Sequence, residues 1–194
     1  RVCELFGVDV AWLPQATDSD ACFGVTDLGG FLPAPVPIHG VLGDSHAALF
    51  AQGCFERGMA KATLGTGSSV MMNVGTRFVA SSHGLSRSLA WRMGGVAEYV
   101  LEGNVTYAGA VKTWLRDDLE LIANPDEVTE LCLAANPESR VYFVPAFTGL
   151  GAPHWCAEAE GCVFGMTRTT GRAEFVKAAD ESIAFQIFDV IDAM

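Results

Sequence analysis

The fold of this chain is decided by residues 60–74, which read AKATLGTGSSVMMNV. Two β-strands are predicted here, at 60–64 and 69–74, because two short runs that are largely apolar flank the glycine-containing turn Gly65-Thr66-Gly67. A turn of this length and composition is typical of a β-hairpin. From about residue 40 onward we therefore expect strands and helices to alternate.

A second hairpin and three helices are predicted after this stretch. The hairpin has strands at 87–92 and 96–101, and its turn is Gly94-Gly95, since two glycines tolerate the positive φ of a two-residue connection. The remaining elements are helices over 105–118, 124–136 and 174–194 and a strand over 141–144.

The second predicted helix has a clear start signal. Asn124 can cap it, Pro125 suits the first helical position, and Glu127 lies three residues after the cap. The last predicted helix is apolar on almost every side, so it is expected to pack between layers. Hairpins followed by helices, a further strand and a buried helix predict an α/β protein whose mixed sheet has covered faces.

Composition excludes several classes of protein. The 194 residues are 50% hydrophobic and 18% charged, which favours a packed core over disorder. The net charge of −11, without a run of Lys or Arg, argues against a nucleic-acid partner. The longest uncharged stretch, 141–157, is broken by prolines and glycines, so no membrane span is expected. Six scattered cysteines without a C-x-x-C pair favour free thiols and a cytoplasmic location.

The chain is expected to be a piece of a longer protein. It begins with Arg1, and no signal-peptide or transit-peptide pattern follows. Residues 33–37, which read PAPVP, suit a stiff extended connector, so a domain boundary is expected near residue 40.

Asp44 is the first candidate for chemistry. Gly43-Asp44-Ser45-His46 could be a nucleophile motif of one esterase class, but no Asp lies three residues before any His, as that class requires. Asp44 itself, between a strand and a helix, could act as a general base on a substrate hydroxyl. Its simpler interpretation is a helix N-cap.

The glycine-containing turn is the second candidate. Residues 65–69 begin like a dinucleotide fingerprint, but Val70 replaces the third glycine and a strand follows. The turn instead offers successive backbone N–H groups and a hydroxyl to phosphate oxygens, or it is an ordinary hairpin turn. A further candidate is the stretch from Glu102-Gly103-Asn104 to Gly109. Gly109 lies inside a predicted helix at a cost of about 1 kcal/mol, which close approach of a ligand or another helix would explain. The loop at 144–155 is expected mainly to pack, with a structural His154.

Taken together, these segments resemble the FGGY family of carbohydrate kinases, most nearly its members that phosphorylate glycerol. The resemblance extends from about residue 38 to the C-terminus and more weakly through 1–37. Its carriers are Gly43-Asp44, Ala47 to Phe50, Gly58 to Lys61, Leu64 to Gly67, Leu101-Glu102-Gly103, Trp114 to Asp117, Val144 to Trp155 and Glu181 to Gln186. The C-terminal signature is nearly matched by Gly161 to Met166 and Glu174 to Glu181, with Asp180 in place of the usual apolar residue.

The resemblance implies an actin-like, ribonuclease H-like sugar-kinase fold, with residues 1–37 ending one domain and 38–194 forming the first half of the nucleotide-binding domain. It implies ATP, accompanied by Mg²⁺, as the phosphoryl donor. No set of metal-binding side chains is expected in the chain itself. The implied roles are Asp44 as catalytic base and Gly65, Thr66, Gly67, Gly109 and Thr113 as nucleotide-binding residues. A fragment of this kind is expected to be inactive alone.

The departures from the family pattern concern the substrate. The family members usually have a Gln and an aromatic residue that touch the acceptor, and this chain has Ser45 and Ser69 at those positions. Thr113 replaces a Gln that faces the nucleotide in the family. Two shorter side chains would enlarge the acceptor pocket for a longer polyol or a ketose. The expected partner is a small polyol or sugar, and a homo-oligomer is compatible with the sequence. The alternative function is a non-catalytic, actin-like nucleotide-binding or interaction module.

Overall fold

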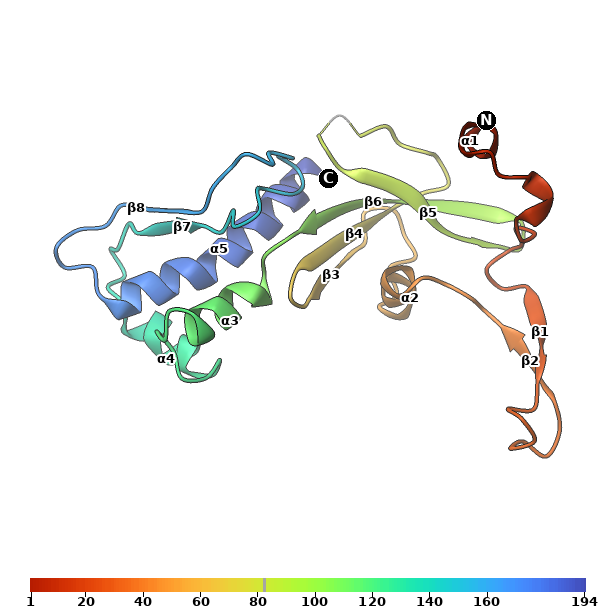
Figure 1. The fold of residues 1–194 in the computed structure, drawn as a ribbon, viewed down its shortest axis with the longest axis horizontal. Coiled ribbons are helices and arrows are strands. Elements are labelled where there is room, and N and C mark those ends of the chain that lie inside the picture. Colours follow the sequence, from red (N-terminus) through yellow and green to blue (C-terminus); the bar gives the residue numbers. More distant parts are fainter. Residues whose placement is uncertain (82) are drawn as a thin grey trace.

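The computed structural model describes residues 1–81 and 83–194 as an elongated α/β molecule (Figure 1). The helices are α1 (Val2–Phe6), the short 3₁₀ helix η1 (Val10–Trp12), α2 (Asp44–Ala51), α3 (Gly109–Asp117), α4 (Glu127–Ala134) and α5 (Arg172–Ala193). The strands are β1 (Cys22–Thr26), β2 (Val36–His39), β3 (Ala60–Leu64), β4 (Ser68–Gly75), β5 (Ser86–Met93), β6 (Val96–Val105), β7 (Tyr142–Val144) and β8 (Cys162–Phe164).

The central sheet has four antiparallel strands in the order β3-β4-β6-β5. Both predicted hairpins are confirmed, and Gly94 and Gly95 take positive φ angles of 55° and 79° in the turn between β5 and β6. All pairs of named strands in the described chain are antiparallel.

The predicted helix over 105–118 starts too early. Strand β6 continues to Val105, and α3 begins only at Gly109. The strand extends because Leu101 and Val105, on alternate positions, are both buried against the same core, and a β-branched residue suits a pleated surface. Tertiary burial therefore overrides the helical periodicity that the sequence suggests.

Each face of the central sheet is covered by one helix. Helix α2 packs Leu49 against Met71, Trp91 and Val100 on one face. The C-terminal half of α5 packs Val190 against the opposite face, in a cluster with Val70, Val74, Leu85, Leu101, Val105 and Ala152. The covering helices that the sequence predicts are thus confirmed.

The N-terminal half of α5 belongs to a second packed region. There Val176 and Ala179 contact Val111 and Leu115 of α3, together with residues from α4 and β7. Figure 1 shows α5 running beside α3 and the β7-β8 pair before it reaches the sheet. One buried helix therefore joins both cores, as expected for a helix that is apolar on almost every side.

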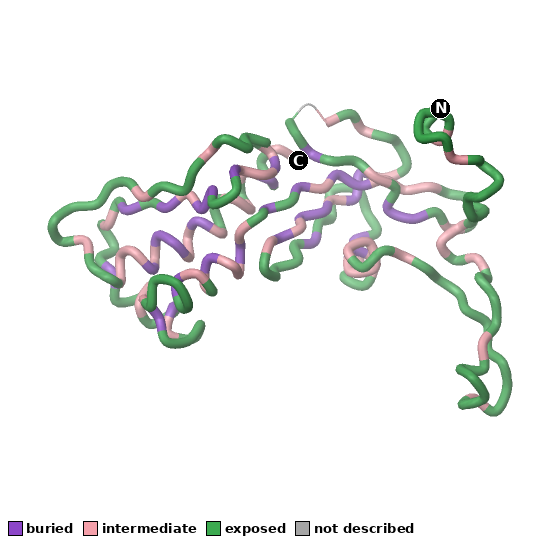
Figure 2. The backbone as a smooth tube through the Cα atoms, in the orientation of Figure 1, coloured by how far each residue is buried: buried purple, intermediate pink, exposed green. Residues whose placement is uncertain are grey.

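The N-terminal part of the chain contributes little to the core. No residue before Leu49 is buried, and Figure 2 shows this N-terminal part of the chain in the colours of exposed and intermediate residues. Residues 36 and 37, predicted as part of a stiff extended connector, lie in strand β2 and pair with β1 at Thr26 and Val25. The role of residues 33–37 as a domain connector stays a prediction.

The predicted start of the second helix is close but displaced. The Asn124 side chain accepts hydrogen bonds from the backbone N–H groups of Asp126 and Glu127, so it caps as expected. Regular helix nevertheless begins at Glu127, whose carboxylate turns back to the Ala123 N–H rather than to that of Asn124.

Within the described chain, no helix is both long and apolar enough to span a membrane.

Candidate functional site

Asp44 is the first residue of α2. Gly43 occupies the N-cap, with extended backbone angles, so Asp44 is not the N-cap residue. The Asp44 carboxylate accepts a hydrogen bond from the Ser45 N–H at 2.7 Å, and this is its only hydrogen bond within the described residues. Because the side chain is exposed, most of its accepting capacity is available to a ligand. Ser45 beside it is half-buried.

The sheet face beneath the start of α2 carries a buried lysine. Lys61 is only 2% exposed, and its ammonium donates to Thr63 Oγ1 at 2.9 Å, Ser69 Oγ at 3.2 Å and Ser69 O at 3.4 Å. Burial lowers the pKa of Lys61, while the negative charges of Glu102 and Asp44 act in the opposite direction. Lys61 therefore lies in the electrostatic field of both carboxylates.

Ser69 links the lysine to a second carboxylate. Its hydroxyl donates to Glu102 Oε1 at 2.9 Å while it accepts from Lys61. The sequence indicates no role for Lys61 and includes Glu102 only as the start of a candidate segment, although both lie inside the motifs that carry the resemblance. The signal in the sequence that could have identified them is a single charged residue within a largely apolar strand.

The Gly65-Thr66-Gly67 turn docks onto the start of α3. The Gly65 and Thr66 carbonyls accept hydrogen bonds of 2.9–3.0 Å from the backbone N–H groups of residues 108–110. In contrast, the N–H groups of Thr66 and Gly67 have no acceptor among residues 1–81 and 83–194, and Thr66 is exposed. Two adjacent free amides and a threonine hydroxyl are the donors that a phosphate group requires.

Gly109 is explained by this docking. It is the first residue of α3 rather than an interior one, and a Cβ there would lie 2.6 Å from the Gly65 carbonyl oxygen. The close approach is therefore made by the hairpin turn, not by a ligand or another helix as expected. Gly109 also lines a pocket of about 380 Å³ with Gly65, Lys112 and Asp180.

Lys112 and Asp180 form an ion pair across that pocket, with 2.9 Å between Nζ and Oδ1. Asp180 is the residue that departs from the family signature, and its pairing with Lys112 gives the departure a physical reason. Thr113 lies exposed on α3, one helical turn after Gly109.

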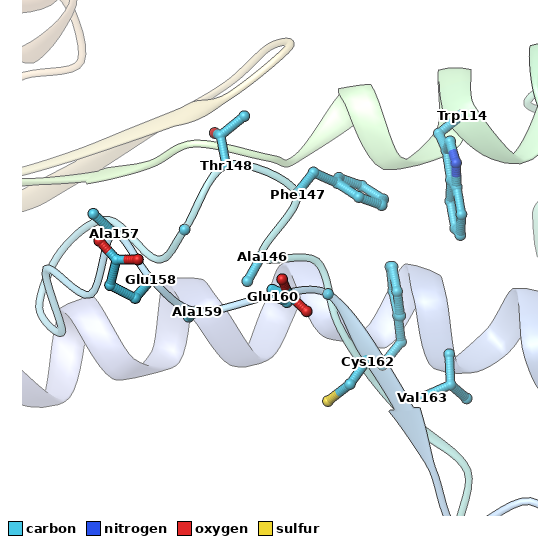
Figure 3. Close-up of a pocket in the computed structure, with 13 residues that line it drawn as sticks. Trp114, Ala146, Phe147, Thr148, Ala157, Glu158, Ala159, Glu160, Cys162 and Val163 are labelled. Carbon is cyan, nitrogen blue, oxygen red and sulfur yellow. The ribbon is translucent and has the colours of Figure 1, made fainter.

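A larger pocket, of about 580 Å³, has none of these residues in its lining (Figure 3). Trp114, Phe143 and Phe147 form an aromatic part of its lining, with the Trp114 and Phe143 rings stacked 5.4 Å apart. Glu158 and Glu160 come from the loop before β8. None of the predicted site residues lines this pocket, and the sequence analysis did not anticipate it.

Residues 60–194 match the model of the FGGY family of carbohydrate kinases, C-terminal domain. The chain belongs to this family. It is 51% identical over 194 residues to the glycerol kinase of Agrobacterium fabrum, covering all of this chain and 39% of that relative. The predicted family resemblance is confirmed. The chain spans about two fifths of the length of the curated relatives it matches.

Solved structures agree with the family assignment. The glycerol kinase of Plasmodium falciparum with ADP superimposes with a TM-score of 0.89 at 33% identity, over 98% of this chain and 38% of that one. A xylulose kinase from Lactobacillus acidophilus gives a TM-score of 0.83 at 20% identity, over 99% and 39%, which shows the shared fold. The chain thus has the actin-like sugar-kinase fold that the resemblance implied.

The part of the chain that the structure describes contains no group of three or more His, Cys, Asp or Glu side chains arranged to hold a metal ion.

Proposed function

We propose that the complete protein to which this chain belongs is an ATP-dependent kinase that phosphorylates a hydroxyl group of a small polyol or sugar. The observation that carries the proposal is an exposed carboxylate, Asp44, beside a hairpin whose turn has two free amides at Thr66 and Gly67. Helix α2 packs against β3, and the charge of Asp44 acts on Lys61 of that strand. The name of the Agrobacterium fabrum relative points to glycerol as the first acceptor to test.

The proposed chemistry needs a base and a phosphate cradle. Asp44 accepts the proton of the acceptor's hydroxyl group. The oxygen of that hydroxyl group forms a bond to the γ-phosphorus of ATP, while the bond from this phosphorus to the departing ADP breaks. Thr66 and Gly67 hold phosphate oxygens through their N–H groups and the Thr66 hydroxyl. Phosphoryl transfer depends mainly on positioning and charge stabilisation, so these groups address the main requirements.

Gly109 shapes the cradle by allowing the turn and α3 to approach closely, and Gly65 supplies the carbonyl that accepts the Gly109 N–H. Thr113 lies on the same helical face as Gly109. Mg²⁺ would accompany ATP and neutralise charge on its phosphates. The free amides of Thr66 and Gly67 suit the phosphate oxygens of such a nucleotide.

The proposal also covers the domain division and the compartment. Residues 1–37 would end the N-terminal domain, and 38–194 would form the first half of the C-terminal, nucleotide-binding domain. The absence of burial before Leu49 and the start of the family match at residue 60 support this division. All six cysteines are free, and ATP is the proposed phosphoryl donor, which together favour the cytoplasm.

The decisive experiment is Asp44→Asn in the complete protein. Asn keeps the side-chain size and can still accept from the Ser45 N–H, but it loses basicity. We expect kcat for glycerol phosphorylation to fall by about 10²–10⁴-fold, the usual contribution of a general base, with unchanged thermal unfolding. Asp9→Asn is the matched control, since Asp9 is also exposed and accepts one local backbone N–H.

Near-normal turnover of the Asp44→Asn variant would contradict the assigned role of Asp44. If the unsubstituted protein binds ATP but consumes none with any polyol or sugar, the proposed kinase function is wrong. That second outcome would favour a non-catalytic nucleotide-binding module.

A further inference from the structure

The face of the central sheet that α2 covers carries, beside its apolar cluster, a relay of hydrogen bonds that leads from a buried cation to a carboxylate oxygen of Glu102. Lys61 of β3, Met71 of β4 and Glu102 of β6 lie directly opposite one another in the ladders. Thr63 and Ser69 form the neighbouring row, two residues along. Because side chains two residues apart share a face, the polar members of both rows project together on the side covered by α2.

Lys61 has no donor left for a substrate. An ammonium group has three N–H donors, and the three acceptors of Lys61 are Thr63 Oγ1 and both oxygens of Ser69. The side chain is also buried. Lys61 therefore makes no hydrogen bond of its own to a bound molecule, and its contacts reach such a molecule only through the residues that it holds.

Ser69 transmits that influence to Glu102. A serine hydroxyl has a single proton, and Ser69 directs it to Glu102 Oε1 while accepting from Lys61. The Glu102 side chain is thereby held in one orientation. Its other oxygen, Oε2, has no hydrogen-bond partner among the described residues, and Glu102 is only half-buried.

Asp44 begins α2, which packs against β3 and covers the sheet face that carries Lys61 and Glu102. Both carboxylates thus lie on the side of the sheet where the Lys61 ammonium is buried, and both act on its charge. Two carboxylates near each other repel, and the ammonium of Lys61 offsets this repulsion. A molecule that complements the pair needs two hydroxyl groups, one for each carboxylate. A polyol with hydroxyls on several carbons has this chemistry, whereas a simple alcohol does not.

We propose that Glu102 is a specificity-determining residue for the acceptor, which accepts a hydrogen bond from a second hydroxyl at Oε2 while Asp44 takes the proton of the first. Lys61 is a positioning residue that acts on Glu102 through Ser69. The inference deepens the proposed function and rests on it. It also gives Ser69 a role other than widening the acceptor pocket, because its hydroxyl is engaged in the relay.

The test compares acceptors that differ by one hydroxyl in the complete protein. Glycerol is the polyol, and 1,2-propanediol and 1,3-propanediol each lack one of its hydroxyls. In Glu102→Leu, we expect kcat/KM for glycerol to fall by about 10–100-fold, the size expected for a hydrogen bond to a charged group. The rate for the diol that lacks the recognised hydroxyl should stay nearly unchanged, so the variant loses discrimination.

Ser69→Ala is the second variant and makes a smaller change. It leaves the Glu102 side chain in place but removes the hydroxyl group that donates to Glu102 Oε1. We expect the same loss of discrimination, with a raised KM for glycerol and a nearly normal kcat. Ser86→Ala is the matched control, since the Ser86 hydroxyl donates to the backbone carbonyl of Glu102 and not to its carboxylate. Thermal unfolding of each variant checks the fold.

Full discrimination retained by folded Glu102→Leu or Ser69→Ala would overturn the inference, as would an equal effect of Ser86→Ala. These results leave the kinase function intact, since turnover would still be measured. If the unsubstituted protein shows no acceptor-dependent ATP consumption, the proposed function fails and the inference fails with it.

Discussion

The two glycines of the Gly65-Thr66-Gly67 turn should respond oppositely to a single added methyl group. A Cβ at Gly67 would lie 2.7 Å from the Val105 carbonyl oxygen and 3.0 Å from that of Thr106. The first distance is 0.7 Å below the 3.4 Å at which ordinary contacts begin, and both neighbours are backbone atoms that cannot swing aside. A Cβ at Gly65 would lie 3.6 Å from its closest neighbour, the Gly67 carbonyl oxygen.

The expected cost follows from this geometry. Overpacking of this kind typically costs about 1–3 kcal/mol, and in a chain of this size each kcal/mol lowers Tm by about 2–4 °C. Gly67→Ala should therefore lower Tm by about 2–12 °C. Gly65→Ala should leave it unchanged or slightly raised, because alanine reduces the conformational freedom of the unfolded chain.

Thermal unfolding of the two variants, followed by circular dichroism on one protein preparation, makes the comparison direct. Equal melting temperatures for Gly65→Ala and Gly67→Ala would refute the inferred close approach of β6 to the turn. The result also bears on tests of phosphate binding, because a larger residue at Gly67 perturbs the fold as well as the cradle.

Two further predictions concern stability. Ser68 Oγ is buried without a hydrogen-bond partner among the described residues, so Ser68→Ala should raise the free energy of unfolding by about 1 kcal/mol in urea titrations, and a loss of stability would contradict this. The pKa of Glu174 is lowered, chiefly by the N–H groups of Asn136 and Gly171, so its contribution to stability is complete above the ordinary glutamate pKa and is lost as pH falls through the lowered folded-state value. Urea midpoints between pH 7 and pH 3 should therefore fall less steeply for Glu174→Gln than for the unsubstituted protein, and equal slopes would show that this carboxylate does not contribute.

Local patterns predicted the elements whose signals lie within a few residues. The β3-β4 hairpin could be predicted because its glycine-containing turn and flanking apolar runs are contiguous, and Asn124 could be recognised as a cap because capping joins residues two or three apart. The family motifs added Asp44 and the phosphate turn as candidates, because each occupies a short stretch of characteristic sequence.

Only the tertiary structure decided how distant segments use these residues. It brought Gly109 against Gly65 and Lys61 beside Glu102, across separations of about forty residues that no local periodicity records. It also extended β6 to Val105, because burial against α5 outweighed the helical pattern at that point. Local preferences are worth only a few tenths of a kcal/mol per residue, whereas burial of a large apolar side chain is worth about 1.5–3 kcal/mol, so packing determines the structure wherever the two disagree.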